Sequence, residues 1–116
     1  MDRSPALAAL SALAHETRLD IVRLLVRRGR RGAPAGEIAR MVSVSASRLS
    51  FHLRLLEQAG LVTATREGRQ VIYAFDRARM GALIGYLLSD CCADDPEVRA
   101  CCSQAAIRLP AEDGAG

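Results

Sequence analysis

Lysine and tryptophan are missing from this chain, and aromatic residues are scarce. Its 116 residues include no lysine and no tryptophan, and the only aromatic side chains are Phe51, Tyr73, Phe75 and Tyr86. A core of Leu, Ile, Val and Ala with so few aromatic residues favours packed helices over a β-sandwich. Arginine or aspartate interrupts every apolar stretch well before 18 residues, which argues against a membrane span. The N-terminal sequence lacks the basic and apolar regions of a secretory signal, so we expect a cytoplasmic protein.

Positive charge is concentrated in the first two thirds of the chain. All sixteen basic residues are arginine. Residues 1–80 hold 14 of them against seven acidic residues, a net charge of +7, whereas residues 81–116 carry a net charge of −4. A chain of this length forms one domain with a single modest core. Its basic front indicates a polyanionic partner, and its acidic end indicates a separate role.

Helical periodicity accounts for the first 60 residues. Apolar residues at three- and four-residue spacing predict a helix over about residues 5–14 and a second one within HETRLDIVRLLVRR. A short helix over about residues 35–41 leads through the turn SVS to a longer helix that Ser45 can cap. One face of this longer helix is apolar and carries Leu49, Leu53 and Leu56. Two helices joined by a turn of about three residues predict a helix-turn-helix.

The period changes from that of a helix to that of a strand after residue 60. Alternating residues predict strands over about 61–66 and 70–75, joined by a tight turn. A helix over about residues 77–89 follows, with Asp76 as its N-cap. ADDPE then predicts the start of another helix at Pro96, and the tail PAEDGAG is expected to be disordered. The expected fold class is mainly α with a β-hairpin wing, a winged helix-turn-helix.

Polar and basic side chains gather on the outer side of the second helix of this motif and at the tip of the wing. Such side chains can reach phosphates or base edges in a major groove, and wing arginines can enter a minor groove. The alternative is a solvated helix face with an ordinary basic hairpin; for the histidine, it is a hydrogen bond to the backbone. Helix, turn, helix and wing in this order within a basic segment favour DNA binding. The candidate residues are Ser45, Ser47, Arg48, Ser50, His52, Arg66 and Arg69.

The first helix and the last helix of this domain have broad apolar faces that so small a chain buries only partly by itself. Helix-turn-helix proteins usually read two half-sites as two-fold dimers, which requires such a surface. We therefore expect a homodimer on double-stranded DNA. The alternative is that these faces close the core of the monomer. The residues expected at the dimer seam are Leu7, Leu10, Ile84, Leu87 and Leu88.

All four cysteines lie within the stretch SDCCADDPEVRACC. A reducing compartment disfavours a disulfide framework, and adjacent cysteines rarely pair without strain. Zinc remains an alternative although its usual C-x₂₋₄-C spacing is missing, and so does a thiol redox switch. Trivalent arsenic or antimony takes three thiolates in a pyramid, which two neighbouring segments can supply. No cysteine lies in an anion-binding loop of the kind an arsenate reductase needs, so we expect no enzyme. The candidate ligands are Cys91, Cys92, Cys101 and Cys102.

Three stretches resemble the ArsR-type family of small bacterial repressors, which sense metals and metalloids: LAHETRLDIVRLL, SASRLSFHLRLLEQAGLVTATREGRQVIYAF and GYLLSDCC. The resemblance covers about residues 5–92 and is closest to the branch that senses arsenicals through cysteines after the last core helix. It implies a homodimeric repressor that binds operator DNA and is released by arsenite, methylarsenite or antimonite. It also implies Cys91 and Cys92 as ligands, together with Cys101 or Cys102.

Other sensing sites of that family have no matching residues here. The stretch from Glu37 to Met41 contains no thiol, and no histidine lies between Asp76 and Asp90. We therefore expect residues 1–92 to form the DNA-binding and dimerisation domain. Residues 93–116 are expected to form a C-terminal segment that carries the second cysteine pair. Zinc sensing or thiol oxidation through the same cysteines is the alternative function.

Overall fold

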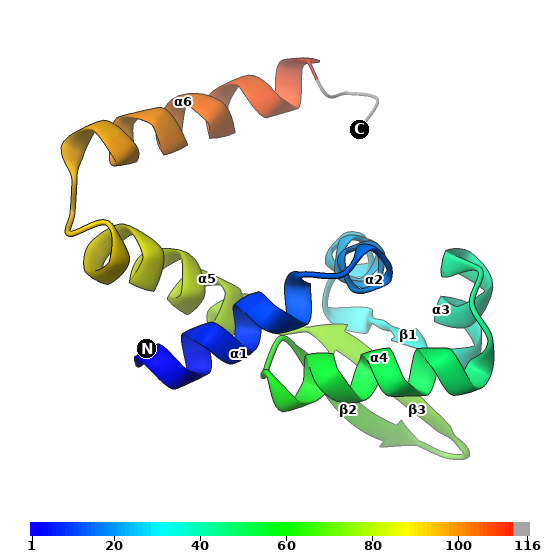
Figure 1. Ribbon diagram of the computed structural model, residues 1–116. Helices are drawn as coiled ribbons and strands as arrows, with labels where there is room; N and C mark the ends of the chain where they lie inside the picture. The colour runs from blue at the N-terminus through cyan, green and yellow to red at the C-terminus, as the bar shows by residue number, and fades with distance from the viewer. Residues whose placement is uncertain (113–116) are drawn as a thin grey trace.

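Over residues 1–112, the body of the molecule combines five α-helices with a small antiparallel sheet, and a sixth helix extends from it (Figure 1). The computed structural model describes the backbone of residues 1–112 and the side chains of residues 1–104. Within these residues the predicted winged helix-turn-helix is confirmed. The helices are α1 (Arg3–Leu13), α2 (Glu16–Arg28), α3 (Ala35–Val42), α4 (Ala46–Gln58), α5 (Arg77–Tyr86) and α6 (Pro96–Glu112), and the strands are β1 (Ala33–Pro34), β2 (Val62–Glu67) and β3 (Gln70–Phe75).

Side chains cap the helices that matter for the candidate sites. The hydroxyl of Ser45 accepts a hydrogen bond from the backbone N–H of Arg48 at 3.3 Å and begins α4. The carboxylate of Asp76 accepts one from the N–H of Arg79 at 2.9 Å and begins α5. Both caps were predicted, because an oxygen on a short side chain satisfies an N–H group that the first turn leaves free. The N-cap of α1 is Asp2.

Helix α1 packs on the core through alanines and turns Leu7 and Leu10 outward. Ala6, Ala9 and Ala12 are buried, whereas 57% of Leu7 and 38% of Leu10 are exposed. Methyl groups let α1 lie close to α4, and the rest of the core comes mainly from Ile, Leu and Val of α2, α3, α4 and β2. None of the described helices is long and apolar enough to span a membrane.

A two-residue strand, β1, joins the sheet and was not predicted. The order is β1–β3–β2, and Ala33 pairs with Tyr73 in antiparallel register. Gly32 makes this pairing possible: its φ is +66°, and a Cβ there would collide with the carbonyl oxygen of Tyr73. Glycine alone tolerates both the conformation and the approach. As a result, the entry to α3 is fastened to the wing.

The end of α5 differs from the single helix expected over residues 77–89. α5 passes at Leu87 into a π-helical turn (Leu87–Cys91), and the chain then reverses with positive φ at Ala93 and Asp94. Helix α6 begins at Pro96, as predicted, and Asp95 caps it by accepting hydrogen bonds from two backbone N–H groups at 2.9 and 3.1 Å. The expected disordered tail is wrong for residues 110–112, which belong to α6, and its last four residues lie outside the described part.

Candidate DNA interface and thiol site

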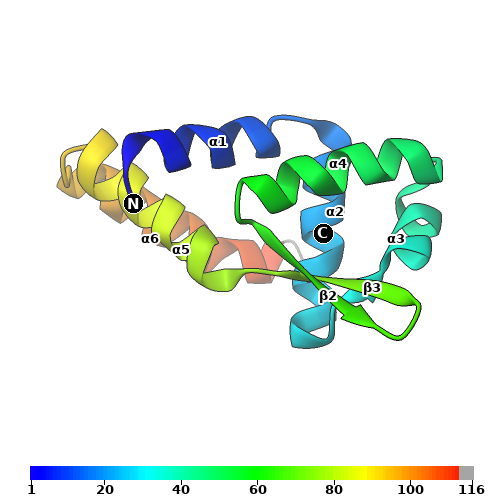
Figure 2. The same ribbon diagram turned by 90° about the horizontal axis from the view of Figure 1, so that it is seen from below.

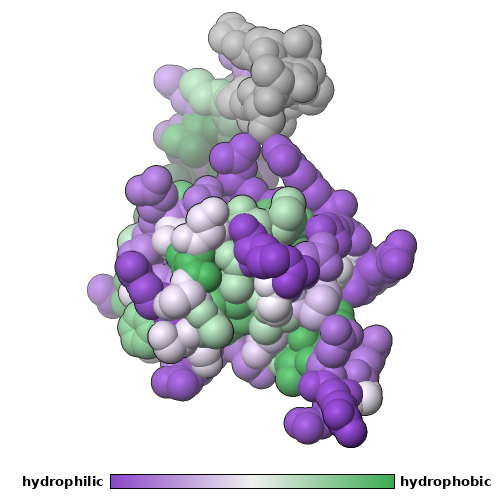
Figure 3. Space-filling model, turned by 90° about the vertical axis from the view of Figure 1, so that its right-hand side faces the viewer, coloured by the Kyte–Doolittle hydropathy of each residue, from purple (hydrophilic) through white to green (hydrophobic). Residues whose placement is uncertain are grey.

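The helix α3, the start of α4 and the tip of the wing lie at one end of the molecule (Figures 1 and 2). Figure 3 looks at this end and shows hydrophilic side chains projecting around a smaller hydrophobic area. Six of the seven candidate DNA-binding side chains are exposed, as the sequence predicts; their contact with DNA stays a prediction. They are Ser45, Ser47, Arg48, Ser50, Arg66 and Arg69.

The start of α4 combines backbone and side-chain donors. The first N–H groups of a helix point outward and carry the positive end of its dipole, which favours a phosphate. Ser45 already accepts from the N–H of Arg48, and its hydroxyl lies 3.4 Å from that of Ser47. The exposed side chains of Arg48 and Ser50 follow on the first two turns. This end of α4 therefore suits the surface of a duplex.

The expectation that His52 faces DNA is wrong. Only 4% of its surface is exposed, and it lies against Arg18 of α2, which is 9% exposed. Arg18 donates a hydrogen bond to Nδ1 of His52 at 3.0 Å and another to the carbonyl oxygen of Ala12 at 2.6 Å. Burial of these polar groups is tolerated because each finds a partner inside.

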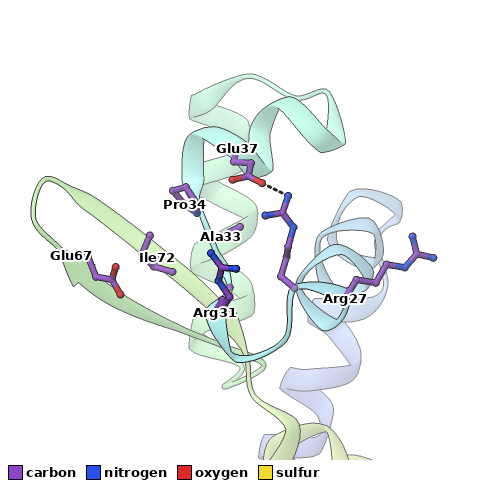
Figure 4. Close-up of a pocket in the computed structure, with 9 residues that line it drawn as sticks. Arg27, Arg31, Ala33, Pro34, Glu37, Glu67 and Ile72 are labelled. Atoms are coloured by element: carbon purple, nitrogen blue, oxygen red, sulfur yellow. Dashed lines mark ion pairs between the residues drawn. The ribbon is translucent and has the colours of Figure 1, made fainter.

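A cluster of arginines that the sequence analysis passed over surrounds a cavity of about 600 Å³ between the end of α2, β1 and the wing (Figure 4). An ion pair joins Arg28 to Glu37 across it. Figure 4 shows Arg31, Glu67 and Ile72 on its other side, while Arg27 points away. Glu37 and Glu67 line the same cavity and offset the charge of two of its three arginines, and we assign it no ligand.

The four cysteines are free thiols at the surface. Cys91, Cys101 and Cys102 are exposed and Cys92 is half-buried. Burial raises the pKa of Cys92, and the neighbouring Cys91 and Asp95 raise it further. Among the residues whose side chains are described, no three Cys, His, Asp or Glu lie close enough together to hold a metal ion. A site that draws on both cysteine pairs therefore requires the two segments to approach each other.

An ion pair fixes the turn between the two cysteine pairs. The guanidinium of Arg99 in α6 donates to the hydroxyl of Ser89 at 3.2 Å and to the carboxylate of Asp94 at 2.7 Å. The hydrogen bond from Arg99 to Asp94, together with a hydrogen bond between Ser89 and Asp94, holds the pKa of Asp94 below its usual value. One side chain thus links α6 to the π-helical turn that ends at Cys91.

The order of helices, the antiparallel wing and the polar end of the molecule define a winged helix-turn-helix protein of the DNA-binding class. A family model described as a helix-turn-helix domain matches residues 13–64. The HTH-type transcriptional regulator YgaV of Escherichia coli is 33% identical over 87 residues, which cover 75% of this chain and 86% of that protein. An ArsR-like transcriptional regulator from Rhodococcus sp. RHA1 superposes with a TM-score of 0.66 at 27% identity, covering 94% of each chain. The chain belongs to the ArsR family of transcriptional regulators.

Other members differ in what their names say they respond to. A probable mercury resistance operon repressor of Streptomyces lividans is 33% identical over 102 residues, 87% of this chain and 74% of that protein. A possible transcriptional regulator for arsenical resistance has a TM-score of 0.63 at 32% identity, covering 71% of this chain and 82% of that one. A possible ArsR-family regulator of Mycobacterium bovis, solved as a homodimeric winged helix-turn-helix domain, has a TM-score of 0.60 at 27% identity, covering 79% and 85%.

Proposed function

We propose that this protein is a homodimeric repressor that leaves its operator when trivalent arsenic, as arsenite or an organoarsenical, binds its C-terminal thiols. One observation carries the proposal: every cysteine of the chain belongs to one of two adjacent pairs, on either side of the turn that follows α5. All four are free, and none is deeply buried. Accessible paired thiols with no structural partner are suited to capturing a soft ion.

The chemistry of arsenite needs no further reactant. Three As–S bonds form as three As–O bonds break, and the three thiol protons leave with the three hydroxyl groups as water. The lone pair on arsenic fills the fourth direction, so three thiolates complete the site. Two adjacent cysteines and one from a neighbouring segment meet this requirement.

The ligands we assign are Cys91, Cys92 and Cys102. The choice of Cys102 rests on Arg99, because this side chain reaches back to the turn that ends α5. Successive residues of a helix are about 100° apart, so Cys102 lies about 60° from Arg99 around α6 and Cys101 about 160° from it. Cys102 is therefore the one directed more nearly toward the first pair.

The proposed dimer seam includes α5, the helix that leads to the cysteine turn, so a bound ion can affect the arrangement of the two subunits. Leu7 and Leu10 of α1 and Ile84 of α5 are exposed, and α1 lies beside α5 (Figure 1). The regulator from Mycobacterium bovis is a homodimer, and α5 leads directly into the cysteine turn. A thiol–arsenic bridge that changes the path of α5 would shift the two recognition helices relative to each other. Coupling of this kind typically amounts to about 1–3 kcal/mol.

A fluorescence anisotropy titration tests the proposal. The probe is a duplex of about 30 base pairs, long enough for two half-sites, selected by the wild-type protein from a randomised library. Arsenite should release the wild type and Cys101→Ser, whereas Cys91→Ser, Cys92→Ser and Cys102→Ser should bind DNA normally and stay bound. Serine keeps the shape, but its protonated hydroxyl is a poor ligand for a soft ion.

A methylated inducer provides the matched control. Methylarsenite has one bond already made to carbon and needs two thiolates, so it should still release Cys102→Ser. Identical behaviour of Cys101→Ser and Cys102→Ser would contradict the three-thiolate site. Loss of DNA binding in the cysteine variants without inducer would indicate a structural site of the kind that zinc forms. Release by peroxide alone would indicate a redox sensor.

Mercury(II) is a second candidate because the described thiols come in pairs and not in threes. Mercury is soft and is satisfied by two thiolates, and a relative from Streptomyces lividans is a probable mercury resistance operon repressor. Native mass spectrometry separates the two ions. Arsenic is supported if the wild type binds one arsenic atom per chain and both Cys92→Ser and Cys102→Ser fail to bind it. Mercury is supported if each chain binds two mercury ions, one at each cysteine pair.

A further inference from the structure

Both histidines of the chain meet where α1 ends and α4 passes beneath it. The ring centroids of His15 and His52 are 4.6 Å apart. Arg18 lies beside them and joins the carbonyl oxygen of Ala12, in α1, to His52, in α4. Arg18 and His52 therefore connect α1 to the recognition helix, and they are in direct contact although they lie 34 positions apart in the sequence.

The direction of these hydrogen bonds fixes the state of both rings. A guanidinium can only donate, so Nδ1 of His52 must accept, and its proton is on Nε2. Nδ1 of His15 accepts from the backbone N–H of Thr17 at 3.1 Å and caps α2. Each ring therefore needs an unprotonated Nδ1. Protonation would turn both acceptors into donors that face a donor.

Among the residues whose side chains are described, the charged groups that shift the pKa of His52 are all basic. The groups that act on it are His15 from the α1–α2 connection, Arg18 from α2 and Arg48 from its own helix. Burial lowers the pKa of His52 below 6.5, and the positive neighbours lower it further. The folded protein therefore holds the neutral ring at neutral pH. Because the unfolded chain takes up the proton more readily, the contribution of this pair is lost as the pH falls below about 6.5.

We propose that Arg18 and His52 are positioning residues for DNA binding, which hold the recognition helix to α1 through a hydrogen bond that exists only while His52 is neutral. Arg18 places α4 relative to the helix that carries Leu7 and Leu10, and so relative to the dimer seam. Weakening the hydrogen bond between Arg18 and His52 lets the recognition helix change its angle relative to the dimer seam. It alters no side chain that we expect to contact DNA. The inference does not depend on which ion binds the cysteines.

The direction in which DNA affinity changes with pH distinguishes a positioning role of His52 from direct contact with DNA. A histidine that faces phosphate gains positive charge in acid and tightens DNA binding. A histidine that must accept from an arginine does the opposite. We expect the affinity of the wild type for its selected duplex to fall at least about threefold as the pH is lowered from about 7.5 to well below the ordinary histidine pKa of about 6.5, because His52 takes up its proton only below that value. The salt dependence at neutral pH should be unaffected by changes at position 52, because no phosphate contact is lost.

Three variants test the proposal in anisotropy titrations at constant ionic strength, with circular dichroism to confirm the fold at each pH. His52→Asn retains an acceptor near the position of Nδ1 but cannot titrate, so it should bind like the wild type at neutral pH and lose the acid effect. His52→Leu removes the acceptor and should bind at least about tenfold more weakly at every pH, since it leaves a buried donor unpaired. His15→Asn retains the cap of α2 and should keep the acid effect of His52.

The proposal is overturned if His52→Asn keeps the pH dependence of the wild type, or if acid tightens binding. It is also overturned if folded His52→Leu binds DNA as the wild type does and is only less stable, since the pair would then support the fold alone. Should His52→Leu fail to fold, the pH profile of His52→Asn decides. Arg18→Met/His52→Leu, in which no buried donor is stranded, should recover stability but not affinity.

Discussion

At the scale of single residues, the start of α4 separates side chains that hold the helix from those available to a partner. Ser45 caps the helix, whereas the guanidinium of Arg48 is exposed and forms no hydrogen bond or ion pair with another described side chain. His52, one turn further on, is buried. The recognition surface is therefore narrower than the polar residues of α4 suggest, and Arg48 is its most prominent charge.

Arg48→Ala should weaken binding to the selected duplex by about 1–3 kcal/mol, the usual range for a lost arginine contact in a groove. It removes a surface donor and no core volume, so the melting temperature should be unchanged. Arg77→Ala is the matched control, because Arg77 is equally exposed but begins α5, at the base of the wing. Equal binding isotherms for Arg48→Ala and the wild type over several salt concentrations would remove Arg48 from the interface.

The local pattern predicted Arg48 and misplaced His52 for a physical reason. Spacing along α4 assigns Leu49, Leu53 and Leu56 to the core, and all three are buried. His52 falls beside Leu56 on the helical wheel, at the edge of that face, and a titratable residue at an edge is usually solvated. What draws it inside is Arg18, from a helix 34 residues earlier. Periodicity within one helix carries no information about a donor supplied by another.

At the scale of elements, the sequence predicted the two strands of the wing, β2 and β3, but not the third strand of the sheet, β1. Alternation revealed β2 and β3 to within a residue at their ends, but β1 has two residues, too few to show a period. The same limit applies to the π-helical turn, since its five residues are too few to show a change of period. The caps at Ser45, Asp76 and Asp95 were predictable because each uses a side chain within three residues.

Gly32→Ala should destabilise the fold more than Gly29→Ala does. Both glycines have positive φ and extended ψ, a combination that costs other residues about 1–3 kcal/mol. A Cβ at Gly29 meets no atom within 4 Å, whereas a Cβ at Gly32 collides with the backbone of Tyr73. The difference between the two free energies of unfolding, from urea titrations, therefore reports the contact between β1 and β3. Equal values would mean that β1 adds nothing to the sheet.

At the scale of the whole molecule, the exposed leucines of α1 are the clearest sign of a second copy. Leu7→Glu should leave the monomer folded, because this side chain is 57% exposed. It should shift the protein from dimer to monomer in sedimentation velocity and weaken binding to the two-site duplex by at least about tenfold, since bivalent attachment is lost. Leu19→Glu, on the exposed side of α2, is the control. A dimeric Leu7→Glu would place the seam elsewhere.

The strand β1 has a mechanical consequence. By fastening the entry of α3 to β3, it joins the helix-turn-helix and the wing into one rigid block. In the proposed dimer, two such blocks would act like the jaws of a caliper, with the pivot where α1 and α5 lie side by side. A small rotation at the pivot is magnified at the jaws in proportion to their length. In that dimer, a structural change at the C-terminal end of α5 would therefore alter the spacing of the two recognition helices along DNA without altering the shape of either jaw.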